Sequence, residues 1–262
     1  MSYELILIYG LVSIFLGIGP AIIFAIWKFG IKKELWISWI LGGLFWLLAL
    51  FARIFIILYI NSLPQTLSYR LVLFSFLAGL FETSFRVLLL TMFTRKTADT
   101  AEKIYMAGLG WGSGEAIYLH TINLSILLFI TPDASLIHQL KGIEYILIFS
   151  SIERILAEIF HVCMMILVFY GIKDKLKISE NSTPIENSFF TKDPKPTTFW
   201  ILIVIGLHFA FDYIFVSLVA SIGIFVYIFG VIWDGLLFYY LFNRLKNYPL
   251  FLNNLKKSEN EK

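Results

Sequence analysis

The sequence is poor in charge and almost free of cysteine. Of its 262 residues, 15% are charged and only one, Cys163, is a cysteine. Soluble domains carry roughly 25% charged residues, so this composition argues against a soluble globular protein. A single cysteine cannot form a disulfide within the chain, so the redox compartment is left open. The sequence also lacks a P-loop, an HExxH motif and a nucleophile elbow, which are common signatures of nucleotide hydrolysis, zinc proteolysis and serine hydrolysis.

Long apolar segments stand in place of the missing charge. The chain is 59% hydrophobic, with a mean hydropathy of +0.81. A helix needs about 20 mostly apolar residues to cross the hydrocarbon layer. We therefore predict an all-α, polytopic membrane protein, a bundle of about seven transmembrane helices. The segments that meet this requirement are approximately 4–27, 35–60, 67–93, 104–130, 143–172, 198–217 and 222–243.

The distribution of basic residues predicts how the bundle is oriented. Cytoplasmic loops collect Lys and Arg, and here these residues follow the first, third, fifth and seventh segments. We therefore expect the N-terminus outside and the C-terminus in the cytoplasm. The residues are Lys28, Lys32 and Lys33; Arg95, Lys96 and Lys103; Lys173, Lys175, Lys177, Lys192 and Lys195; and Arg244, Lys246, Lys256, Lys257 and Lys262.

The chain reads as one integral membrane domain over residues 1–252, followed by a charged cytoplasmic tail over 253–262. The first apolar segment is not preceded by a basic stretch. We therefore interpret it as a transmembrane helix and not as a cleaved signal peptide.

Ionisable residues interrupt the apolar segments at a common depth. An ionisable group at the bilayer centre costs roughly 2.5–3.5 kcal/mol and usually finds partners inside the bundle. We therefore expect the side chains at this depth to meet one another. At about 1.5 Å of rise per residue, the residues near the middle of four consecutive segments are Glu82, Glu115, His161 and His208.

Helical spacing gives two of these residues a charged neighbour on the same face. Glu82 and Arg86 are four residues apart, and so are His208 and Asp212. We expect Arg86 to keep Glu82 ionised and Asp212 to orient the imidazole of His208. The glycine-rich stretch 108–115 repeats glycine every four residues on two faces. This spacing predicts close helix approach and a locally unwound backbone beside a cavity.

Two imidazoles with one or two carboxylates suit two kinds of hydrolytic chemistry. Zinc binds imidazole and carboxylate, and catalytic sites keep an open position for water. Without a metal, a glutamate can activate water while histidines stabilise an oxyanion. Both alternatives predict cleavage of a peptide bond within or beside the membrane. For the metal alternative, the expected ligands are Glu115, His161 and His208.

Four motifs resemble those of the YhfC family of membrane proteases. They are ETSFR at 82–86, GLGWGSGE at 108–115, ERILAEIFH at 153–161 and HFAFD at 208–212. The family is grouped with the type II CAAX-processing and PrsW proteases, and distantly with a non-catalytic subunit of gamma-secretase. The resemblance covers about residues 79–215. In two places the chain departs from the wider group: Phe81 precedes Glu82 where some relatives have a second glutamate, and Trp111 stands where relatives often carry histidine.

The resemblance implies a catalytic set and a cellular setting. Glu82 would activate water and Arg86 would support it, whereas Glu115 would be a further ligand or a proton carrier. The remaining expected catalytic residues are His161, His208 and Asp212. The implied substrate is a membrane protein or a membrane-associated peptide, and the implied location is a prokaryotic plasma membrane. The basic loops are read as topology signals, so we expect no nucleic-acid partner.

Two other functions fit the same residues. A proton-coupled transporter or channel would use the buried Glu, His and Asp as a relay, and it predicts a polar path to both membrane faces. A non-catalytic scaffold or immunity-type protein would keep the polar core for assembly alone. It predicts that substitution of Glu82 lowers abundance without changing any cleavage.

Overall fold

The computed structural model describes residues 3–64, 66–130, 145–173, 176, 197–222 and 225–245. Within these ranges the chain is helical and has no strand, which confirms the predicted all-α class. The tail 253–262 and most of the basic loop residues after position 173 lie outside the described residues. The helices are α1 (Tyr3–Phe29), α2 (Lys33–Ser62), α3 (Leu67–Met92), α4 (Thr94–Thr97), α5 (Ala101–Glu115), η1 (Ala116–Ile122), α6 (Asn123–Ser125), η2 (Ile126–Ile130), α8 (Tyr145–Ile172), α9 (Thr197–Ile222) and α10 (Val226–Leu245).

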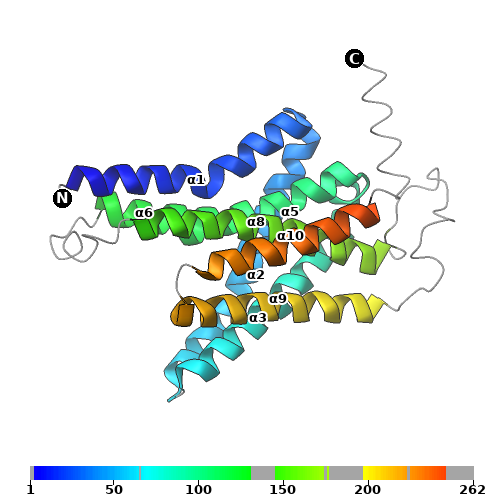
Figure 1. Ribbon diagram of the computed structural model, residues 1–262. Coiled ribbons are helices and arrows are strands. Elements are labelled where there is room, and N and C mark those ends of the chain that lie inside the picture. Colours follow the sequence, from blue (N-terminus) through cyan, green and yellow to red (C-terminus); the bar gives the residue numbers. More distant parts are fainter. Residues whose placement is uncertain are drawn as a thin grey trace.

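The helices form a membrane-type bundle. Five of them, α1, α2, α3, α8 and α9, are long and apolar enough to cross a membrane, and α10 contributes a shorter apolar helix, Val226–Leu241. In Figure 1, α1, α8, α9 and α10 run nearly alongside one another, whereas α2 and α3 cross them obliquely. The helix α8 packs against α1, α5, α9 and α10, so it forms the centre of the bundle.

The fourth expected segment, 104–130, is helical but not uniform. The α-helical part ends at Glu115, and the backbone then widens into the π-helix η1 and, after a short α-helical turn, into η2. The Asn123 amide donates to the carbonyls of Tyr118 and Leu119, at 3.2 and 3.0 Å, which gives extra partners to carbonyls in the widened turn. The expected unwinding near Glu115 is therefore a widening of the helix. π-helical segments are rare in proteins, and those that occur often lie at functional sites.

Glycines in α5 bring it into contact with helices on two sides. A Cβ on Gly110 would overlap the backbone carbonyl of Trp39 in α2. On another face, a Cβ on Gly112 would lie 2.7 Å from the Cα of Glu158 in α8. The predicted close helix approach is confirmed. Because α5 is held between α2 and α8, residues on three helices can reach one interior region.

The contact between α3 and α9 also depends on a glycine. A Cβ on Gly79 would lie 2.7 Å from the Ile205 carbonyl oxygen and 3.4 Å from the Cβ of His208. Glu82 is one turn further along α3, so the close crossing places it beside His208.

Thr66 begins α3 by accepting a hydrogen bond from the Tyr69 amide, as N-cap threonines do.

Candidate active site

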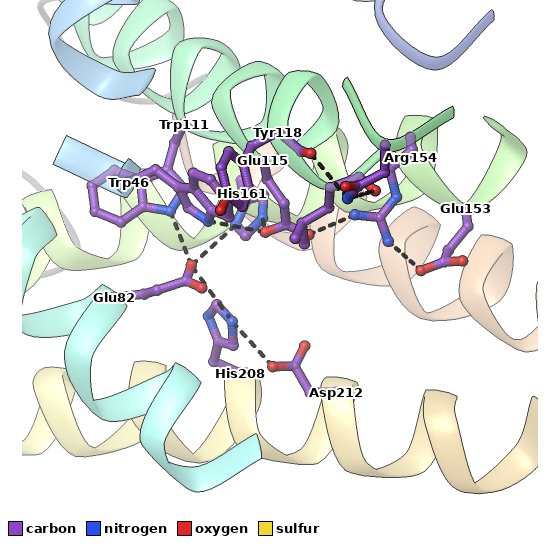
Figure 2. Close-up of polar contacts among 12 residues, drawn as sticks. Trp46, Glu82, Trp111, Glu115, Tyr118, Glu153, Arg154, His161, His208 and Asp212 are labelled. Atoms are coloured by element: carbon purple, nitrogen blue, oxygen red, sulfur yellow. Dashed lines mark hydrogen bonds and ion pairs between the residues drawn. The ribbon is translucent and has the colours of Figure 1, made fainter. Parts of the chain in front are cut away.

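Side chains from four helices meet inside the bundle. Figure 2 shows Glu82 from α3, Glu115 from α5, His161 from α8 and His208 from α9 grouped together. Glu82 Oε2 lies 4.0 Å from His161 Nδ1 and 3.7 Å from His208 Nε2. His161 Nε2 lies 2.9 Å from Glu115 Oε2. The common depth that the sequence predicts is thus a direct contact in the structure.

Three donors on three helices hold the carboxylate of Glu82. Arg53 of α2 donates to Oε1 at 3.1 Å. Arg86 and Trp111 donate to Oε2, at 3.3 and 2.9 Å. The Arg86 guanidinium also lies over the Trp111 ring, 4.3 Å from its centroid, so the indole contacts both members of the pair. The predicted pairing of Glu82 with Arg86 is present, and Arg53 and Trp111 complete it.

The hydrogen bonds of His161 fix its tautomer. Arg86 Nη2 lies 2.6 Å from His161 Nδ1. Arginine has only donors, so Nδ1 must be the acceptor in this contact. The ring proton is therefore on Nε2, which donates to Glu115 Oε2. His161 is thus a neutral imidazole held between a guanidinium and a carboxylate.

The carboxylate of Glu115 is bound in a similar way but in a more open place. Trp46 donates to its Oε2 at 3.1 Å, and Arg154 donates to its Oε1 at 2.8 Å. Arg154 also pairs with Glu153, whose side chain is 34% exposed. The side chain of Glu115 is 14% exposed, against 2% for that of Glu82.

His208 lies between two carboxylates. Its Nε2 is 3.7 Å from Glu82 Oε2 and 3.5 Å from Asp212 Oδ2, one turn further along α9. Its Nδ1 is buried and has no hydrogen-bond partner within the described ranges. Behind the ring, Phe160 packs edge-on at 5.4 Å and stacks on Phe211 at 4.3 Å. These rings cover one side of His208. The side chain of Asp212 is 31% exposed, so it lies at the solvent-accessible edge of the site.

Glu82, His161 and His208 could hold a metal ion. Each offers one ligand atom, these atoms lie within 4.8 Å of one another, and all three residues are buried. One carboxylate with two imidazoles is a donor set that zinc uses in catalytic sites. The expected ligand Glu115 is not part of this group; it hydrogen-bonds to the ligand His161. Such a carboxylate–histidine contact typically orients a metal-binding imidazole.

Sequence reasoning missed four of the residues that hold the carboxylates, which are Arg53, Arg154, Trp46 and Trp111. Arg53 stands alone in an apolar segment, and its charge was a usable signal. Trp46 and Trp111 gave no such signal, because tryptophan is common in apolar segments and its N–H partner depends on packing. Both indole rings are completely buried, and buried tryptophan usually finds a hydrogen-bond acceptor.

A second polar group lies towards the N-terminal end of α8. Ser13 Oγ lies 3.1 Å from His120 Nε2 and 2.7 Å from Ser151 Oγ. Ser151 also donates to the Ser13 carbonyl at 2.9 Å. These contacts tie α1, η1 and α8 together, and they give a structural reason for a histidine in the widened helix.

Comparison with protein families, with curated proteins and with solved structures finds no match to this chain. The resemblance to the YhfC family therefore stays a prediction carried by the four motifs.

Proposed function

We propose that this protein is an intramembrane peptidase. The observation that carries the proposal is the convergence of Glu82, His161 and His208 from three helices, with ligand atoms within 4.8 Å in a buried interior. An interior site of this kind is costly in a membrane and usually functional. The substrate we propose is a segment of a membrane protein or a membrane-associated peptide.

The hydrogen bonds suggest how the residues would divide the work. Glu82 would accept a proton from water, and Glu115 would hold the His161 tautomer that carries its proton on Nε2. Glu82 Oε2 lies 4.0 Å from His161 Nδ1 and 3.7 Å from His208 Nε2, so a water bound to Glu82 would lie beside both imidazoles. His208, oriented by Asp212, would then donate to the oxyanion of the scissile carbonyl.

Zinc belongs to this proposal as one of two versions. Glu82, His161 and His208 would hold the ion, because their donor types and convergence suit it. A bound zinc would polarise the scissile carbonyl and supply a more acidic water. The metal-free version relies on the same three side chains.

The polar groups beside α8 extend from the site in one direction, which supports a hydrolase more than a transporter. The polar chain runs from Glu82 through Glu115 to Glu153, towards the N-terminal end of α8. On the other side of His161, residues 162–169 of α8 are all apolar and buried. A transporter needs polar groups along both directions, and beyond His161 these would have to come from helices other than α8, such as the buried Asp234 of α10. The N-outside orientation and a prokaryotic plasma membrane belong to the same proposal and rest on the basic residues and the motif resemblance.

The proposal is tested by comparing the protein N-termini that cleavage creates in membranes containing the wild type or its variants. Membranes from cells that make the wild type, Glu82→Gln, His161→Ala or His208→Ala would be labelled at newly formed N-termini. Glu34→Gln is the matched control, because Glu34 is exposed at the start of α2. We expect cleavage products with the wild type and the control and their loss in the three site variants.

Cleavage that survives in all three site variants would refute the proposal. Protein abundance, measured by immunoblot in the same membranes, normalises the product signals, and the scaffold alternative is separated by whether any product depends on the site residues. If Glu82→Gln lowers abundance and no product depends on any site residue, the scaffold function is the better account.

A further inference from the structure

Arg86 contacts two of the three residues that could hold a metal ion. Its Nη2 lies 2.6 Å from His161 Nδ1 and 3.3 Å from Glu82 Oε2. The Nδ1 atom of His161 is also the ring nitrogen on the side of Glu82. One cationic group therefore already occupies the ligand atoms that a metal cation would need.

The lone pair of His161 cannot serve both cations. A neutral imidazole has one acceptor nitrogen, and in this tautomer it is Nδ1. Arg86 uses that lone pair, while the Nε2 proton is used by Glu115. A metal ion could bind His161 Nδ1 only after the hydrogen bond from Arg86 has broken.

The ligand atoms lie further apart than they would around a bound zinc ion. With zinc bonds of about 2.0–2.1 Å, the ligand atoms of a tetrahedral site are about 3.3 Å apart. Here Glu82 Oε2 is 3.7 Å from His208 Nε2 and 4.0 Å from His161 Nδ1. The three side chains would have to close in on an ion.

Few contacts hold Arg86 in this position. Its Nε and Nη1 atoms are buried without a hydrogen-bond partner in the part of the chain that the structure describes. Its Nη2 atom contacts Glu82 and His161, and its plane lies over the ring of Trp111. The guanidinium is thus held by one nitrogen and one ring.

We propose that Arg86 and a divalent metal ion are alternative occupants of the Glu82–His161–His208 site. Arg86 acts as a built-in competitor that keeps the site closed to the metal until the Arg86–His161 hydrogen bond opens. The proposal goes beyond the peptidase function and does not require it, because it concerns occupancy of the site alone.

Cobalt binding to detergent-purified protein tests the competition. Co²⁺ would be titrated into the wild type and Arg86→Met, with its visible absorption as the readout. Loss of a hydrogen bond between a charged group and His161 predicts about tenfold tighter binding in Arg86→Met, at one ion per chain. His161→Ala added to Arg86→Met should abolish the signal. Arg70→Met is the matched control, because the Arg70 side chain donates to the Leu63 carbonyl near the α2–α3 turn, away from the candidate site.

Equal cobalt affinity in the wild type and Arg86→Met overturns the proposal, and so does binding that survives the loss of His161. A measurement on the wild type covers the case in which Arg86→Met does not fold. Nitrogen NMR of labelled histidine should show His161 with its proton on Nε2, and Co²⁺ or Zn²⁺ should shift Nδ1. A proton on Nδ1 in the metal-free protein would contradict the proposal. Neither readout involves cleavage, so failure here is distinguishable from failure of the peptidase function.

Discussion

The two buried glutamates are held by similar donors in different surroundings. Glu82 and Glu115 each accept one indole N–H and at least one guanidinium N–H. Glu82 has two guanidinium groups and is sealed in the bundle, whereas Glu115 shares its single guanidinium with Glu153 and is partly exposed. The difference indicates that Glu82 organises the interior, and that Glu115 connects the interior to the accessible edge.

Replacing Glu82 by glutamine has the largest expected effect. Arg53 and Arg86 would lose their shared counter-charge, and breaking a buried ion pair costs about 3–5 kcal/mol of unfolding free energy. Glu115→Gln should cost only about 1–3 kcal/mol, because Arg154 keeps Glu153. Denaturant unfolding in detergent, followed by circular dichroism, measures both. Equal losses of unfolding free energy would show that the deeper burial of Glu82 does not make it more important for stability than Glu115.

Replacing Gly110 by alanine should disturb both glutamates together. The added Cβ would overlap the Trp39 carbonyl and push α5 away from α2, and overpacking of this kind costs about 3 kcal/mol. Because α5 carries both Trp111 and Glu115, each site would lose a partner. Gly206→Ala is the control, since nothing lies within 4 Å of a Cβ there. The same unfolding measurement should show almost no change for the control, and a small loss for Gly110→Ala would contradict the packing argument.

Replacing Trp111 should lower the unfolding free energy more than replacing Trp46, because Trp111 bonds to the more deeply buried glutamate. Trp111→Phe removes a hydrogen bond to a sealed carboxylate and should cost about 2 kcal/mol. Trp46→Phe removes the corresponding bond to the more exposed Glu115 and should cost about 1 kcal/mol, because water can replace the donor. Denaturant unfolding in detergent measures the loss of unfolding free energy in each variant. The reverse order would mean that exposure does not decide the difference.

Replacing Asp212 by asparagine should have the smallest effect on stability and a clear effect on cleavage. Its side chain is 31% exposed and its contact is with His208, so the unfolding free energy should change by no more than about 0.5 kcal/mol. Loss of the carboxylate should slow the proposed cleavage, because His208 would no longer be oriented. Unchanged cleavage of a substrate found by N-terminal labelling would remove Asp212 from the catalytic set.

The fold was largely predictable from the sequence, because apolar length and charge determine helices in lipid. Six of the seven expected segments correspond to single helices, whereas the glycine-rich stretch predicted a local unwinding near Glu115 but not its π-helical form. The N-outside orientation stays a prediction.

The site was predictable at the level of depth but not of partners. Local spacing correctly linked Glu82 with Arg86 and His208 with Asp212. Contacts across helices could not be read from spacing, so Arg53 was not assigned to Glu82. The choice between Glu82 and Glu115 as the third member of the metal-binding group also depends on how α3 and α5 approach α8.

The apolar C-terminal part of α8 has a consequence for proton movement through the bundle. Residues 162–169 are buried and carry no charged side chain, while the ionisable chain from Glu82 to Glu153 leads the other way. Protons cross a bilayer readily where water and titratable groups form a continuous file. This stretch of α8 supplies no carboxylate or imidazole to such a file, so a proton path beyond His161 would have to be built from other helices.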